Sequence, residues 1–221
     1  CCAGGDVADV LRWAAGRGAY ATGLTVDEGP YGRGLFASRA LEPGELVLSV
    51  PLSECSIADE EPGPDSPLRG AAWPVRLACT LLRERAAGAG SPYAPYVSSL
   101  LGSTPAGSPL GAAVTEGCLS ELHSPALEEL CAGLHRSVAG WHAHLGASAP
   151  EAMGGVSLAE MRDAVAVVHS RVFKLRGGGG AEPLHLLAPL AELHNHSRTG
   201  ANVRWRLEEG PEGGAHMQLV A

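Results

Sequence analysis

The sequence predicts an α+β protein in which short strands near both ends enclose a long helical segment. In residues 20–52, short aliphatic and β-branched runs alternate with turns rich in Gly and Pro, which is typical of short strands. Between residues 72 and 172, apolar residues recur three and four positions apart, as on the buried face of a helix. After residue 202 the period returns to two. We therefore expect a β-fold of small sheets interrupted by an inserted helical subdomain.

The composition limits the possible classes of protein. The chain has 221 residues, 45% of them hydrophobic, which is enough for a core of its own. Its net charge is −8 and no block of Lys and Arg is present, which argues against a nucleic-acid partner. No apolar run approaches twenty residues, so no membrane-spanning helix is expected, and no secretory signal is visible. We expect a monomer.

The cysteines indicate a reducing, intracellular compartment, namely cytoplasm, nucleus or chloroplast. None of them lies in a CxxC spacing, so a zinc cluster is not expected. Their scatter over so long a chain also argues against a disulfide framework. The six are Cys1, Cys2, Cys55, Cys79, Cys118 and Cys131.

The N-terminal part is expected to hold one helix and three strands. Asp6 is placed to cap a helix that has one apolar face. Gly16 and Gly18 are expected to end this helix. Strands are predicted at residues 22–26, 35–37 and 46–51. A turn at residues 42–45, EPGE, joins the last two, since Pro presets φ and Gly accepts a positive φ.

The middle of the chain predicts three helices joined by loops. Residues 53–70 and 88–109 are expected to be loops, and residues 72–87 a helix. Ser124 is expected to cap a long helix with Pro125 at its first position. Ser157 and Glu160 form a capping box for a third. Residues 177–180 are four glycines, which predict a linker, and alternating residues after 202 predict two final strands.

These elements define four segments. Residues 1–19 form an N-terminal helix, 20–55 and 181–221 the two parts of the β-fold, and 56–180 the helical insert. The chain begins with Cys and ends inside a strand-like run. We therefore expect a fragment of a longer protein, with its second β-part incomplete.

A polar group near residue 195 is the strongest functional signal. Glu192, Asn195 and His196 fall within five residues, after an apolar run and before a strand. Asn carries a donor and an acceptor that can recognise an amino acid or an amide, and His can donate from one ring nitrogen while the other is anchored. Alternatively, Asn195 lies in a helix C-cap and His196 is a core histidine.

Two further motifs carry weaker signals. Gly32-Arg33-Gly34 precedes a predicted strand, and is either a tight turn or a loop whose backbone approaches a ligand. Ser170-Arg171 ends the third predicted helix, where the helix dipole alone favours a basic residue, or where Arg171 contacts a ligand. A metal site formed by His185, His194 and His196 is a further alternative, but no third ligand is convincingly placed.

The motifs, in their order, resemble a known family. GRGLFASRALEPGELVLSVPL comes first, then the helical insert, HSRVF, and finally LAPLAELHNHS with a strand behind it. This order resembles the SET-domain methyltransferases, in particular the branch of Rubisco large-subunit methyltransferase, which has a helical insert inside the SET domain. The resemblance covers residues 20–210. It implies S-adenosylmethionine as cofactor and a lysine of a protein substrate as methyl acceptor, with histidine as an alternative acceptor.

The resemblance also assigns roles to residues. It implies that the cofactor-binding residues are Tyr31, Gly32, Arg33, Gly34, Ser170, Arg171, Asn195 and His196. Glu192 stands where the family commonly has Asp, and is expected to contribute to substrate binding. The additional methylene can move its carboxylate by about 1.5 Å, one C–C bond length.

One expected residue is missing. The catalytic tyrosine of the family lies in a later segment, and none of the four tyrosines of this chain matches it, so it is expected beyond Ala221. The C-terminal substrate-binding domain of the branch is missing as well. We therefore expect this chain to be inactive alone. The alternative is a SET-like module that binds a partner without catalysis.

Overall fold

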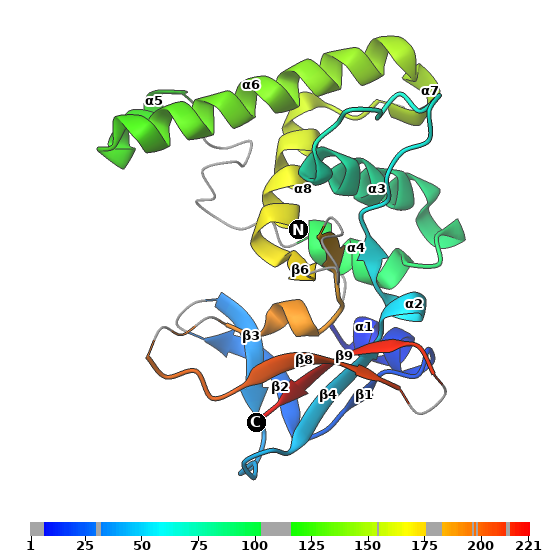
Figure 1. The fold of residues 1–221 in the computed structure, drawn as a ribbon, viewed down its shortest axis with the longest axis vertical. Coiled ribbons are helices and arrows are strands. Elements are labelled where there is room, and N and C mark those ends of the chain that lie inside the picture. Colours follow the sequence, from blue (N-terminus) through cyan, green and yellow to red (C-terminus); the bar gives the residue numbers. More distant parts are fainter. Residues whose placement is uncertain are drawn as a thin grey trace. The chain divides into compact units, whose positions relative to one another are not determined.

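The computed structural model describes residues 7–29, 32–102, 116–153, 155–175, 183–195, 197, 199–210 and 213–221. The chain forms two compact units. A helical unit spans Ala58–Ser170, and a β unit combines Gly5–Ile57 with Arg171–Ala221. The predicted fold class, α+β with helices inserted between two β-rich segments, is confirmed (Figure 1).

The helical unit is built around three longer helices. Its elements are α3 (Trp73–Ala87), η1 (Gly88–Gly90), α4 (Ala94–Leu101), α5 (Glu116–Leu119), η2 (Ser120–Leu122), α6 (Pro125–Ser148), α7 (Pro150–Met153) and α8 (Leu158–Arg171). The last residue of α8 belongs to the β unit. Figure 1 shows α8 running at a steep angle to the long helix α6. The core holds Leu77 and Leu81 of α3, and Met161 and Val165 of α8.

The predicted helix starts are correct at one position and partly wrong at another. Before α8, the backbone N–H of Ser157 donates to Glu160 Oε2 at 2.8 Å, and the N–H of Glu160 donates to Ser157 Oγ at 3.2 Å. The capping box is therefore confirmed. Ser124 occupies the N-cap of α6 with Pro125 behind it, but its side chain makes no capping hydrogen bond.

Two segments predicted as loops contain regular structure. The Gly-, Ser- and Pro-rich stretch 88–109 includes helix α4, in which Tyr96 is fully buried. Two prolines had suggested a loop, but Pro95 lies in the first turn of α4, where its missing N–H costs nothing. Stretch 53–70 holds most of the short helix α2 (Leu52–Cys55) and strand β5 (Ile57–Ala58).

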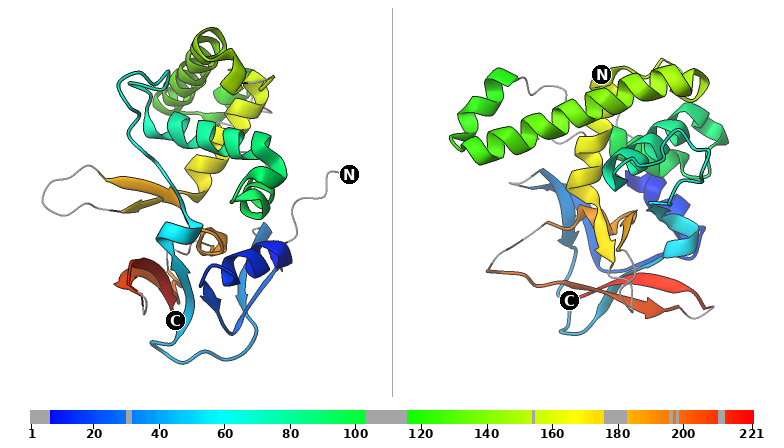
Figure 2. Two further views of the ribbon diagram at one scale, coloured as in Figure 1. Left: turned by 90° about the vertical axis from the view of Figure 1, so that its right-hand side faces the viewer. Right: turned by 45° about the horizontal axis from the view of Figure 1, so that its top comes forward.

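The β unit consists of three small sheets. The first has the strand order β1 (Tyr20–Ala21), β4 (Leu46–Pro51), β9 (Ala215–Val220) and β8 (Arg204–Glu209). The second is the hairpin of β2 (Leu24–Gly29) and β3 (Gly32–Ala37), and the third has the order β5, β7 (Leu184–Leu187) and β6 (Phe173–Leu175). Helix α1 (Val7–Ala15), the short helix α2 and the one-turn helix η4 (Ala191–Leu193) also belong to this unit. Figure 2 shows the β8–β9 hairpin, in orange to red, beside β4.

The strand predictions are confirmed at β4 and corrected at β3. Strand β4 spans residues 46–51 as expected, and the turn before it has Glu45 N–H donating to the Glu42 carbonyl, with Gly44 at φ +87°. Strand β3, however, already begins at Gly32. The Gly32-Arg33-Gly34 motif was expected to precede a strand, but it lies inside one, with Gly34 opposite Asp27 of β2. The antiparallel ladder with β2 extends the strand over residues of low strand propensity.

Two predictions concern residues that the structure does not describe, and two others concern membrane-spanning helices and disulfides. Asp6, the proposed cap of α1, and the glycine linker 177–180 lie outside them. Within the described ranges, no helix is long and apolar enough to cross a membrane. No disulfide links the four cysteines that the structure describes.

Candidate functional site

The polar group lies on a strained connection in the β unit. Strand β7 is buried from His185 to Leu187, and the chain then turns through Leu190 into η4. Leu190 is buried and has φ +68°, a conformation that costs a non-glycine residue free energy of about 1 kcal/mol or more. Such strain persists where surrounding packing imposes it, and it is common at functional sites.

Asn195 lies directly against Gly34. A Cβ atom added to Gly34 would collide with the Asn195 side-chain amide and approach the Leu193 carbonyl oxygen to 3.4 Å. Glycine at this position of β3 leaves room for the Asn195 amide, and a larger side chain would displace that amide. The structure thus brings together two motifs that are 161 positions apart in the sequence.

One oxygen of the Glu192 carboxylate is buried without a hydrogen bond. The residue as a whole is half-buried, yet its Oε2 atom is inaccessible to solvent and has no hydrogen-bond partner among the described residues. Burial raises the pKa of Glu192 to about 8, against the smaller opposing effects of its own backbone hydrogen bond and of the nearby cations Arg171 and Arg33. The side chain is therefore largely neutral at pH 7, and a cation brought to it would favour its ionised form.

Arg171 is positioned beside Glu192. Its Nη1 donates to the Glu192 main-chain carbonyl over 3.4 Å. Its sequence neighbour Ser170 belongs to the helical unit and donates its hydroxyl to the Val167 carbonyl of α8 at 2.9 Å. Arg171 is therefore joined to the polar group, and the Ser170 hydroxyl is engaged in its own helix. Tyr31 and His196 lie outside the described residues.

Aromatic rings extend from the polar group toward β8. The ring of His194 stacks on Phe173 of β6, with centroids 5.9 Å apart, and its Nδ1 contacts the Ala191 carbonyl. Phe173 in turn meets Trp205 of β8 edge-on, at 5.8 Å. These contacts fix the orientation of His194, which the sequence had suggested only as one of three metal ligands.

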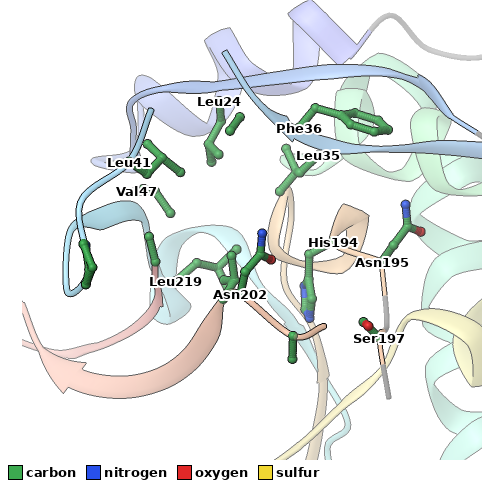
Figure 3. A pocket seen from close by; sticks show the side chains of 15 residues that line it. Leu24, Leu35, Phe36, Leu41, Val47, His194, Asn195, Ser197, Asn202 and Leu219 are labelled. Atoms are coloured by element: carbon green, nitrogen blue, oxygen red, sulfur yellow. The ribbon is translucent and has the colours of Figure 1, made fainter. Parts of the chain in front are cut away.

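A cavity of about 650 Å³ opens beside Asn195, within the range of roughly 300–1,000 Å³ typical of small-molecule sites. One side is apolar and the other polar (Figure 3). The labelled apolar side chains are Leu24, Leu35, Phe36, Leu41, Val47 and Leu219. The labelled polar side chains, which all come from one segment, are His194, Asn195, Ser197 and Asn202. The arrangement suits a ligand with an apolar body and polar edges.

The cavity includes residues that sequence reasoning missed. Ser197 and Asn202 were not predicted as site residues, although they flank the loop between the polar group and β8. The Ser197 hydroxyl accepts a hydrogen bond from Gly200 N–H at 2.9 Å, which orders that loop. The only signal in the sequence was the density of small polar residues after 194. Of the predicted site residues that the structure describes, only Asn195 lines this cavity. The others lie outside its lining, namely Gly32, Arg33, Gly34, Ser170, Arg171 and Glu192.

The described residues do not form a cluster of three or more metal-ligating side chains. Of the three histidines considered for a metal site, His185 is buried in β7 and His194 stacks on Phe173. His196 lies outside the described residues.

Comparison with known proteins gives a result only at the level of structure. No protein-family model matches the chain, and no curated protein matches it. Solved structures do. The SET domain of LSMT bound to lysine and AdoHcy aligns with a TM-score of 0.74 at 20% identity, over 97% of this chain and 50% of that one.

Two further structures agree. Rubisco LSMT bound to AdoMet aligns with a TM-score of 0.71 at 19% identity, over 97% of this chain and 49% of the other. Rubisco LSMT bound to sinefungin and monomethyllysine aligns with a TM-score of 0.69 at 18% identity, over 97% and 48%. The chain thus spans about half the length of the structures that it matches. The resemblance read from the sequence is confirmed for the fold: this chain has the fold of the SET domain of Rubisco LSMT.

Proposed function

We propose that this chain is the cofactor-binding part of an S-adenosylmethionine-dependent protein-lysine N-methyltransferase. The observation that carries the proposal is the seating of Asn195 against Gly34 at the wall of the cavity. The two motifs for which the resemblance implies cofactor contacts thus meet at one place. The solved structures with this fold are described as bound to AdoMet, AdoHcy or sinefungin, and to lysine or methyllysine, which supports the same assignment.

The residues present fit such a cofactor. When bound, S-adenosylmethionine would supply a methyl group bonded to a cationic sulfur, so that an uncharged amine could form a bond to the methyl carbon while the sulfur leaves as a neutral thioether. Arg171 lies outside the cavity lining but is joined to the polar group through the Glu192 carbonyl, and its guanidinium would offer a cation to the cofactor's carboxylate. The Asn195 amide offers a donor and an acceptor for its polar groups, and the apolar side of the cavity covers a flat, weakly polar body. Glycines at 32 and 34 let the backbone of β3 approach closely, and Arg33, Tyr31, Ser170 and His196 complete the proposed set.

Glu192 is assigned to the substrate. A buried carboxylate with an unpartnered oxygen gains a charge-assisted hydrogen bond when an ammonium group reaches it. The acceptor amine must lose its proton before it attacks, and removal from water lowers the pKa of an ammonium group. The chain's task is then positioning, because donor and acceptor must be held within reacting distance. A free histidine side chain is mostly uncharged at pH 7, whereas a lysine is charged, so this contact favours lysine as the acceptor.

Cofactor binding is the direct test. Isothermal titration calorimetry of residues 1–221 with S-adenosylmethionine and with sinefungin should give saturable binding, and Asn195→Ala should abolish it. Gln218→Ala is the matched control, since this amide lies on β9 outside the cavity lining and should leave affinity unchanged. Wild-type affinity in Asn195→Ala would contradict the site.

Turnover is a separate question, and we expect none from this chain alone. Among the described tyrosines, Tyr20 is half-exposed on β1, Tyr93 and Tyr96 belong to the helical unit, and none lines the cavity. This observation favours the alternative, a module that binds without transferring methyl groups, for the isolated chain. Transfer of labelled methyl groups to a lysine-containing protein extract by residues 1–221 would refute the expectation.

A further inference from the structure

Strand β8 is an open edge of the largest sheet. It is the last strand in the order β1-β4-β9-β8, and all six of its residues are exposed. Trp205 and Leu207 are each 42% exposed, although their alternation with charged residues in the sequence is typical of a strand with one buried face. Exposed edge strands bearing large apolar side chains are templates for pairing with a further strand.

The hydrogen bonds of the hairpin show which backbone groups of β8 do not bond to β9. Gly210 N–H donates to the Gly214 carbonyl at the end of the hairpin, and Ala221 N–H donates to Glu45 beside β4. The register pairs Glu208 with His216 and Arg206 with Gln218. Because paired and free positions alternate along an antiparallel strand, the even-numbered residues of β8 bond to β9. The peptide groups of Trp205, Leu207 and Glu209 therefore point outward.

The two faces of the edge differ in charge. Arg204 and Arg206 lie on one face, and Trp205 and Leu207 on the other. Arg204 takes part in none of the ion pairs between described residues, whereas Arg206 shares its guanidinium with Gln218 and Glu208. The first half of β8 is therefore locally positive on a chain whose net charge is −8.

A groove of about 550 Å³ is lined by the first half of β8 together with Gly44, Val220 and Ala221, and it adjoins the candidate cavity. Its lining includes Arg204, Trp205 and Arg206. The residues that line both the groove and the cavity are Ala201, Asn202, Val203 and Ala221. The groove beside the first half of β8 and the candidate cavity are therefore contiguous.

We infer that the open edge of β8 binds an extended protein segment in which acidic and apolar residues alternate. Its acidic side chains face Arg204 and Arg206, its apolar side chains face Trp205 and Leu207, and its backbone bonds to the outward peptide groups. That this segment belongs to the methyl acceptor rests on the proposed function; the strand pairing itself does not. Continuity with the cavity favours such a segment over a second copy of the chain.

The test measures the binding of a fluorescein-labelled, end-blocked peptide, Thr-Val-Glu-Val-Glu-Thr, to residues 1–221 by fluorescence anisotropy at low salt. The double variant Arg204→Ala, Arg206→Ala should weaken binding roughly fivefold, since exposed ion pairs are each worth a factor of about two or three. A peptide with Gln for both Glu should lose about the same factor, and the double variant should not weaken it further. Arg136→Ala, an exposed arginine of the helical unit, is the matched control.

Backbone pairing has its own test. Methylation of both valine nitrogens removes the donors aimed at β8 and should abolish binding. The inference is overturned if the methylated or the Gln peptide binds as well as the parent, or if the parent peptide does not bind. It is also overturned if light scattering shows a dimer that Arg206→Glu dissociates, since a second copy then occupies the edge. None of these peptide-binding or light-scattering measurements contains the cofactor. Their outcome is therefore independent of the S-adenosylmethionine titration that tests the proposed function.

Discussion

Replacing Glu192 by Gln is expected to make the protein more stable than wild type above pH 7, by an amount that grows with pH. Burial raises the pKa of Glu192 in the folded protein to about 8, whereas the unfolded chain has an ordinary value near 4.5. The folded protein favours the neutral form of Glu192. The stability that this neutral form contributes is therefore fully present below pH 4.5 and is lost as the pH rises through 8. At about 1.4 kcal/mol per pKa unit, the loss approaches roughly 5 kcal/mol.

Urea unfolding followed by circular dichroism between pH 5 and pH 9 measures this effect. Gln cannot ionise, so the difference in free energy of unfolding between variant and wild type should increase steadily from pH 5 to pH 8. The constant cost of burying an amide in place of a carboxyl group cancels in that slope. Glu209→Gln on the exposed strand β8 is the control and should show no such slope. A difference independent of pH would mean that Glu192 is ionised in the folded protein.

The second large effect is expected from Gly34→Ala. A single methyl group at this position would collide with the Asn195 amide and come within 3.4 Å of the Leu193 carbonyl oxygen, an ordinary contact distance. Because Asn195 is exposed, its amide can rotate away, so we expect a loss of stability near about 1 kcal/mol, the lower end of the range for overpacking. If the strain is relieved by displacing Asn195, the affinity for S-adenosylmethionine or sinefungin should fall by roughly 10-fold to 100-fold.

Calorimetry with sinefungin, which carries no transferable methyl group, measures this loss without turnover. Gly63→Ala is the matched control, because a Cβ there meets no atom within 4 Å. Wild-type affinity in Gly34→Ala would show that the position of the Asn195 amide does not govern cofactor binding.

Local signals in the sequence were sufficient for some elements but not for others. The capping box of Ser157 and Glu160, the turn at 42–45 and the strand from Leu46 to Pro51 depend on neighbouring residues, and each was predicted correctly. The extension of β3 over Gly32 depends on pairing with β2 and has no local signal. Helix α4 was hidden by two prolines and by the flanking glycines and serines.

The candidate site follows the same division. Asn195 and Gly34 could be recognised as motifs, but the contact between them is a tertiary fact that neither motif contains. Leu190 is buried with a positive φ, and a leucine gives no sign of that conformation in the sequence. The missing hydrogen bond of Glu192 Oε2 likewise depends on what surrounds it. Residue types thus identified the polar group, whereas the contacts and burial of its side chains became visible only in the folded structure.

The pairing of β4 with β9 also bears on how the protein folds. Ser49 lies opposite Gln218, so the central pair of the largest sheet joins segments on either side of the whole helical unit. Contacts between residues so distant in sequence slow folding, because the intervening chain loses entropy before the pairing stabilises it. A helical unit that becomes compact first shortens that loop. During synthesis on the ribosome, β4 therefore cannot pair with β9 until almost the last residue of this chain has been added.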